Sequence, residues 1–203
     1  MVSTRQNGRV NTSFADWRHF NKVLAYVTIG EKVYVLDATE KHTHSKLIPY
    51  EVMYSEGLVI EKIDTWEWGW RTLWDEKPHL RETIFLRANI DEKGLMQGEA
   101  SVSSYDYSRV RRMPILKEGK DKLVEKFFTA GNTSLKVDSI TLKNEEVDSL
   151  PLTQSIQFSQ PINSSGDYKY FSINLFTGLE KNPFLADSRF SDVFLVPTSI
   201  INW

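Results

Sequence analysis

The sequence predicts an α+β fold that is mostly β, with antiparallel strands and one helical insertion. Short apolar segments recur at fairly regular intervals and are separated by turn-forming residues, a cadence typical of antiparallel sheets. The segment at about residues 105–130 has apolar residues at helical spacing instead. We therefore expect the later part of the chain to form an antiparallel β-sandwich-like domain, or a curled sheet, with this helix packed on one face.

A β-hairpin at residues 23–37 is the clearest local prediction. Apolar residues alternate over residues 23–28, Gly30 and Glu31 provide a turn, and residues 32–36 return as the partner strand. Both faces of the first strand are largely apolar, which predicts that it is covered on two sides. The turn also brings Lys22 and Asp37 to the same end of the hairpin, where opposite charges on neighbouring strands form an ion pair.

A row of tryptophans follows, because Trp66, Trp68 and Trp70 would point to one face of an extended strand. Each indole hides on the order of 200 Å² when it is buried, and soluble proteins avoid large exposed apolar patches that they do not use. Burial against a second layer is therefore the favoured interpretation. The alternative is an exposed strip on which these three indoles stack against a sugar or a peptide.

The remaining elements are predicted in the same way. A turn at residues 91–94, with Gly94 free to adopt a positive φ, joins two strands into a hairpin. Pro114 separates or kinks two helical pieces, residues 105–113 and 117–130. The predicted strands after the tryptophan row are residues 83–89, 95–103, 135–143, 152–159, 168–176 and 193–196.

Composition excludes several functions. The 203-residue chain has a net charge of −2, which argues against nucleic acid as a partner. No apolar run approaches the ~20 residues of a membrane-spanning helix, and no phosphate-binding loop or zinc-binding helix motif is present. His42 and His44 could share a face and bind a metal, but no carboxylate of matching character joins them, so a solvated loop is favoured. We predict no cofactor and no metal site.

Residues 20–39, FNKVLAYVTIGEKVYVLDAT, resemble the His/Asp arm of transglutaminase-like cysteine enzymes. In that family a His opens one strand and an Asp closes the next, at the start of an Asp-Ala-Thr or Asp-Pro-Thr signature. The signature here begins at Asp37, and the position of the family's His falls on Lys22. Weaker similarities, in the order found in envelope-associated bacterial members with an attached uncharacterised β-rich domain, cover residues 3–8, 47–50, 56–60 and 182–184, together with Arg189.

The resemblance implies that residues 1–60 are the C-terminal remnant of a transglutaminase-like domain and that the chain begins within that domain. Residues 61–203 would then be the attached β-rich domain, and the parent protein would be periplasmic or located in the cell envelope. Without the helices of a complete domain, the apolar faces of the hairpin need cover from residues 58–74, from the rest of the parent protein or from a second copy of the chain.

The chemistry of such an enzyme is missing from this chain. A thiol enzyme needs a cysteine thiolate and an imidazole that shuttles its proton, but the chain has no cysteine. A lysine, with an ordinary pKa of roughly 10.4, has no lone pair to accept a proton at neutral pH. We therefore expect a non-catalytic structural or interaction module in which Lys22 and Asp37 are relic positions. Two alternatives stay open: a carbohydrate- or peptide-binding domain that uses the tryptophan strip, and a fragment of an active enzyme whose cysteine lies upstream.

Overall fold

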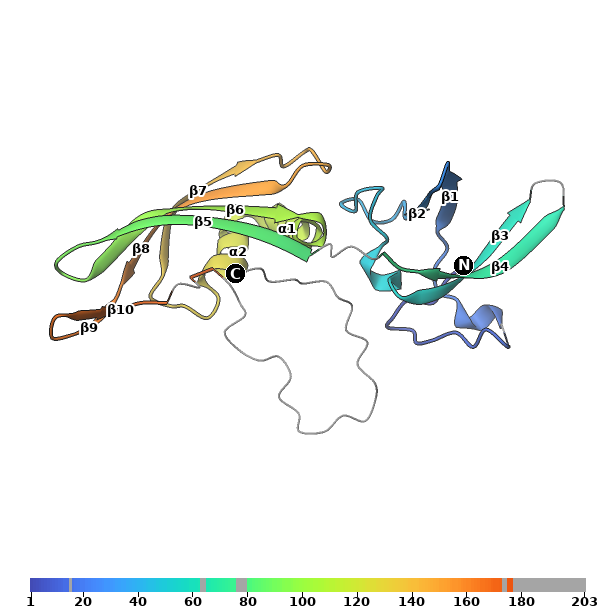
Figure 1. Ribbon diagram of the computed structural model, residues 1–203, viewed down its shortest axis with the longest axis horizontal. Coiled ribbons are helices and arrows are strands. Elements are labelled where there is room, and N and C mark those ends of the chain that lie inside the picture. The colour runs from blue at the N-terminus through green and yellow to red at the C-terminus, as the bar shows by residue number, and fades with distance from the viewer. Residues whose placement is uncertain (15, 63–64, 76–79, 173–174, 177–203) are drawn as a thin grey trace, which may run out of the picture. The chain divides into compact units, whose positions relative to one another are not determined.

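The computed structural model describes residues 1–14, 16–62, 65–75, 80–172 and 175–176 (Figure 1). The chain divides into two compact units, of which the first is formed by residues 1–80 and the second begins at Arg81. Each unit has its own hydrophobic core. Within the described residues, no helix combines the length and the apolar character that crossing a bilayer requires.

The first unit contains two antiparallel hairpins. Strand β1 (Ala25–Ile29) pairs with β2 (Lys32–Leu36), and β3 (Ser55–Lys62) pairs with β4 (Trp66–Leu73). Two short 3-10 helices, η1 (Trp17–His19) and η2 (Tyr50–Val52), lie in the connections. The N-terminal segment joins the hairpins, because Val2 forms β-bridges with Lys22 on one side and with Gly57 of β3 on the other.

The core of the first unit covers only one face of the β1–β2 hairpin. Val2, Val35, Val52 and Leu73 are buried together, and Tyr26 packs against them. Residues on the opposite face, Val23, Val27 and Ile29, are 77%, 37% and 64% exposed. The prediction that the first strand is covered on two sides is therefore wrong within the described structure, although residue 73, from the segment expected to provide cover, does cover the other face.

The second unit is built around a four-stranded antiparallel sheet with the order β5-β6-β8-β7. The strands are β5 (Leu80–Ile90), β6 (Leu95–Tyr105), β7 (Lys136–Lys143) and β8 (Leu152–Pro161). Between β6 and β7 the chain forms α1 (Asp106–Glu118), α2 (Lys120–Val124) and a π-helical turn, η3 (Glu125–Thr129). A small hairpin of β9 (Asn163–Ser165) and β10 (Tyr168–Tyr170) follows β8.

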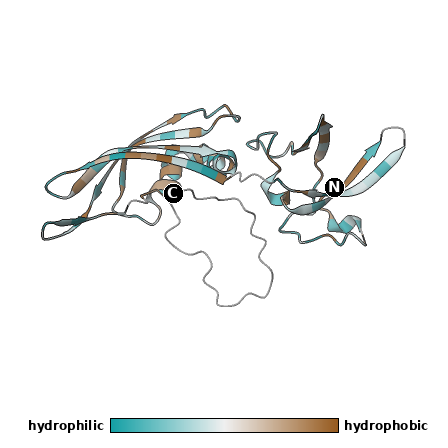
Figure 2. Ribbon diagram, in the orientation of Figure 1, coloured by the Kyte–Doolittle hydropathy of each residue, from teal (hydrophilic) through white to brown (hydrophobic). Residues whose placement is uncertain are grey.

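The helices cover one face of this sheet, and the other face is largely polar although it also carries Phe85, which is 72% exposed. Leu123 and Phe128 are buried with Val102, Ile156 and Phe158 of the central strands. The strand register puts a row of Phe85, Ser101, Ser155 and Thr141 on the opposite face. This alternation is visible along β5 as hydrophobic and hydrophilic bands (Figure 2), and it is the pattern of an antiparallel sheet with one solvated face.

A buried polar network ties α1 to the sheet. Arg112 donates from Nη2 to Glu82 Oε1 at 2.8 Å and from Nη1 to Gln154 Oε1 at 2.9 Å. Gln154 Nε2 in turn donates to Ser104 Oγ at 3.1 Å, and the Arg112 guanidinium lies 4.2 Å from the centre of the Phe127 ring. Burial lowers the pKa of Arg112, and Glu82 offsets part of that effect. The charge is thus compensated in place, as a buried cation requires.

The fold class is confirmed at the level of a mostly β chain with antiparallel sheets and helices. The predicted hairpins at residues 23–37 and 83–103 and the helical region near residues 105–130 are present. The sandwich stays a prediction. The domain boundary at residue 60 also stays a prediction. It was drawn from a resemblance, which a division into compact units does not test.

Two details differ from the sequence prediction. The break between helical pieces lies at Gly119, with φ of 138°, and Pro114 stands inside α1. A backbone with this φ is open chiefly to glycine, so Gly119 ends the helix after Glu118. Of the predicted strand over residues 168–176, the described part contains β10 as its strand, and the predicted strand over residues 193–196 lies outside the described residues.

Candidate functional site

Lys22 is fixed by its backbone just before β1. Val2 donates its N–H to the Lys22 carbonyl at 2.9 Å, and Lys22 donates its N–H to the Val2 carbonyl at 3.1 Å. The lysine side chain is largely buried, with 14% of its surface exposed. The N-terminal segment therefore places the Lys22 ammonium at the end of the β1–β2 hairpin.

Asp37 follows the last residue of β2 and faces this ammonium. Its Oδ1 accepts hydrogen bonds from Thr39 N at 2.9 Å and from Thr39 Oγ1 at 2.6 Å, a local turn that fixes the carboxylate. Its Oδ2 forms an ion pair with Lys22 Nζ, and only 2% of the Asp37 side chain is exposed. The Lys22–Asp37 pair predicted from turn geometry is present in the structure.

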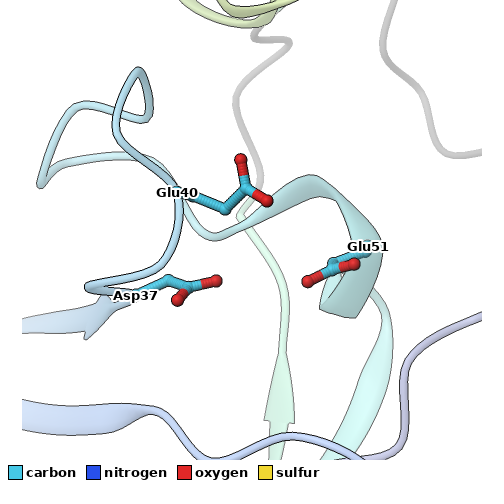
Figure 3. Close-up of side chains that lie close together, drawn as sticks. All are labelled: Asp37, Glu40 and Glu51. Carbon is cyan, nitrogen blue, oxygen red and sulfur yellow. The ribbon is translucent and has the colours of Figure 1, made fainter.

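Two further carboxylates lie at the same place. Glu51, on η2, forms a second ion pair with Lys22 Nζ. Carboxylate oxygens of Asp37, Glu40 and Glu51 lie within 4.8 Å of one another, and the three side chains point toward a common centre (Figure 3). Sequence reasoning missed both glutamates, because no periodicity links a loop and a 3-10 helix to the end of a hairpin.

The electrostatics hold Lys22 in its charged form. Burial lowers the pKa of Lys22, but its hydrogen bonds to Asp37 and Glu51 outweigh burial, so the pKa is raised above its ordinary value. Burial raises the pKa of Asp37, but the bonds from Lys22 and Thr39 outweigh it, so that pKa is lowered. An ammonium with a raised pKa has no lone pair at neutral pH. In this arrangement Lys22 can donate hydrogen bonds but cannot act as a base.

The three carboxylates are of the type that binds hard divalent cations. Here the Lys22 ammonium already neutralises part of their charge, since it pairs with both Asp37 and Glu51. The histidines considered from the sequence do not join this group. His42 and His44 lie half-buried in the loop after β2, and His44 Nδ1 accepts a hydrogen bond from the Lys46 backbone at 3.1 Å.

The tryptophan strip is a second candidate site, and its structure corrects the favoured interpretation. Trp66 and Trp68 are 69% and 73% exposed, so they are not packed in a core. Only Trp70 is half-buried, with its ring stacked on Phe20 at a centroid distance of 6.1 Å. The burial prediction is wrong for the first two indoles because the hairpin extends beyond the core, which reaches β4 only at Leu73.

The neighbours of the strip come from β3. The register sets Leu58 opposite Trp70, Ile60 opposite Trp68 and Lys62 opposite Trp66, and paired residues of an antiparallel ladder share a face. Ile60 is 48% exposed, and Lys62 Nζ lies 5.5 Å from the centre of the Trp66 ring. The result is a continuous apolar surface with one cation at its outer end.

Comparisons with protein families, with characterised proteins and with solved structures find no match to this chain.

Proposed function

We propose that this chain is a non-catalytic interaction module from the C-terminal part of a transglutaminase-like protein. The finer description of its fold, a transglutaminase-like hairpin remnant followed by a sandwich-like domain, is part of this proposal. So is the assignment of Lys22 and Asp37 as relic site positions.

The observation that carries the proposal is the state of Lys22. Where a proton shuttle would be needed, the chain has an ammonium that pairs with both Asp37 and Glu51 and whose pKa is raised. The same geometry weighs against the fragment alternative, because a thiol supplied from upstream would still meet a group that cannot accept its proton. Exposed apolar surfaces on both hairpins of the first unit support the interaction role.

Acyl-transfer assays test the inert site. The wild-type chain and Lys22→Met would be incubated with an activated ester, a glutaminyl peptide and an amine acceptor, with and without an added small thiol. We expect both proteins to match the blank. Turnover by the wild type above the blank would overturn the proposal, and its loss in Lys22→Met, with circular dichroism showing that the variant is folded, would give Lys22 a chemical role.

The exposure of Trp66 and Trp68 favours a second candidate function, the binding of a carbohydrate or peptide through the tryptophan strip. Indole faces stack on apolar ring surfaces, and their fluorescence responds to such contacts. Titration with panels of neutral glycans and extended peptides should quench the fluorescence of the wild type and leave a Trp66→Ala, Trp68→Ala double variant unchanged. An equal response in both proteins would contradict binding at this strip.

A further inference from the structure

The outer edge of β4 has no strand partner among the described residues. The Leu58 N–H of β3 donates to the Met1 carbonyl at 2.9 Å, and the Leu58 carbonyl accepts from the Met1 ammonium at 2.8 Å. Both main-chain groups of Leu58 therefore point away from β4. Hydrogen-bonded and non-hydrogen-bonded pairs alternate in an antiparallel ladder. Trp70, opposite Leu58, therefore directs its own N–H and C=O to the other side of β4. The same holds for Trp68 and Trp66, which lie two and four residues earlier on the strand.

One hydrogen bond agrees with this orientation. The Trp70 carbonyl accepts from Arg71 Nη1 at 2.9 Å, a bond from a side chain beside the strand. Among the described residues, no strand pairs with this edge, because β3 and β4 form a two-stranded sheet. The stretch from Trp66 to Trp70 also lacks the lysine, proline or bulge that commonly protects an edge strand from pairing.

The side chains on this edge make it self-complementary. If two copies of β4 pair antiparallel about a two-fold axis through Trp68, each Trp66 lies opposite Trp70 of the other copy and each Trp68 lies opposite its equivalent. Glu67 then lies opposite Gly69, so no like charges meet. A register shifted to centre on Glu67 would set two carboxylates face to face, which destabilises a cross-strand pair.

We propose that β4 is a self-association edge, at which two copies of this chain pair into a continuous four-stranded sheet with all six indoles of the two strips on one face. This inference rests on the proposed role as an interaction module and names a second copy as its partner. A two-stranded ribbon is marginal in water, and the added strands supply the missing ladder partners. At about 200 Å² for each indole, the interface is of the small, transient class.

The absence of cysteine from the chain allows a direct test of the register. Directly opposed residues of a non-hydrogen-bonded pair have Cα atoms about 4.5 Å apart, within disulfide range. Glu67→Cys and Gly69→Cys would be prepared separately, then oxidised alone and as a mixture. We expect a cross-linked dimer from the mixture and little from either variant alone. Faster cross-linking of either variant alone would overturn the proposed register.

Sedimentation over a concentration series tests the edge itself. Trp68→Ala should weaken association by at least about tenfold, as expected for a central aromatic contact. The matched controls are Trp17→Ala, an indole 80% exposed outside the strip, and Ile29→Thr on the bare face of the β1–β2 hairpin. Both should associate as the wild type does. A monomer at every concentration, or association that only Ile29→Thr weakens, would overturn the self-association edge.

Failure of this inference can be told from failure of the proposed function. A monomer whose strip still responds to the glycan or peptide panel would overturn self-pairing and leave the interaction module in place. Lys22-dependent acyl transfer would overturn the proposed function, whatever the sedimentation results are.

Discussion

At the scale of single residues, Lys22 is a largely buried cation that pairs with carboxylates from two separate elements. The ion pair with Asp37 was predictable because turn geometry alone brings both ends of a hairpin together. The contribution of Glu51 was not, since it arrives from η2 across a loop of irregular sequence. Local spacing in a sequence therefore reveals pairs within one hairpin, whereas partners from separate elements require the tertiary structure.

Lys22→Met should destabilise the chain. It removes the ammonium and leaves the largely buried Asp37 carboxylate beside Glu51 without its cation. We expect a loss of about 2 kcal/mol in the free energy of unfolding, measured by urea denaturation at pH 7. The control is Lys32→Met, an exposed lysine on the same hairpin that should change stability little.

The same pair sets a pH dependence whose sign follows from the pKa shifts. The pKa of Asp37 is lowered in the folded state, so its contribution is present above the unfolded value near 3.9 and lost as pH falls through the folded pKa. The pKa of Lys22 is raised, so its contribution is present below roughly 10.4 and lost as pH rises through the folded pKa. Asp37→Asn should therefore reduce the loss of unfolding free energy that the wild type shows as the pH falls below about 4. An unchanged acid dependence would contradict the role given to Asp37.

Arg112→Met is expected to be more damaging, because Arg112 is 2% exposed and holds both Glu82 and Gln154. Removing one partner of a buried pair typically lowers the free energy of unfolding by about 3–5 kcal/mol. The loss here should be smaller, because the Glu82 carboxylate is partly solvated without Arg112. Arg111→Met, at an exposed neighbouring position, is the control. Equal chemical denaturation midpoints for the two variants would show that the network does not stabilise the second unit.

At the scale of elements, strand and turn chemistry predicted most of what forms. Gly30 and the turn at residues 91–94 lie where the two hairpins reverse direction. The alternation of apolar residues in the strands beside each turn can be read from the local sequence. The prediction that the tryptophan row is buried was wrong because periodicity shows which residues share a face. It does not show whether a second layer covers that face. The predicted position of the helix break was wrong as well, because Pro114 is accommodated within α1 and the break lies at Gly119, whose positive φ is open chiefly to glycine.

Gly98 of β6 is an element-scale constraint that no sequence pattern showed. A Cβ at this position would lie 2.2 Å from the Arg87 carbonyl oxygen and 2.7 Å from Ala88 on the adjacent strand. Gly98→Ala must therefore push β5 and β6 apart, and we expect a loss of about 1–3 kcal/mol in unfolding free energy. Gly69→Ala is the control, because its nearest neighbour is a flexible Arg71 side chain at 3.4 Å. Equal stability of the two variants would contradict the close approach.

At the scale of the whole molecule, the described residues form two hydrophobic cores, and each is internal to one compact unit. Composition could not show how the apolar residues are divided between these cores. Long-range pairing decides that division. An example is Val2, which forms a β-bridge with Gly57, more than fifty residues later in the sequence.

Two cores predict two separately responding regions. In hydrogen exchange followed by mass spectrometry, Lys22→Met should raise exchange within residues 1–75 and Arg112→Met within residues 80–172, because each substitution weakens the core beside it. A variant that raises exchange equally in both regions would show that the chain opens as one cooperative unit.

The uncovered side of the β1–β2 hairpin has a practical consequence for handling this protein. Val23 and Ile29 present aliphatic surface to water in the native state, and environment-sensitive dyes such as ANS bind surface of that kind. Dye fluorescence should therefore be high before any heating. A melting curve recorded with such a dye would combine two signals, the release of dye from the folded protein and the unfolding of the chain. Circular dichroism, which does not depend on that surface, is the sounder readout for comparing variants.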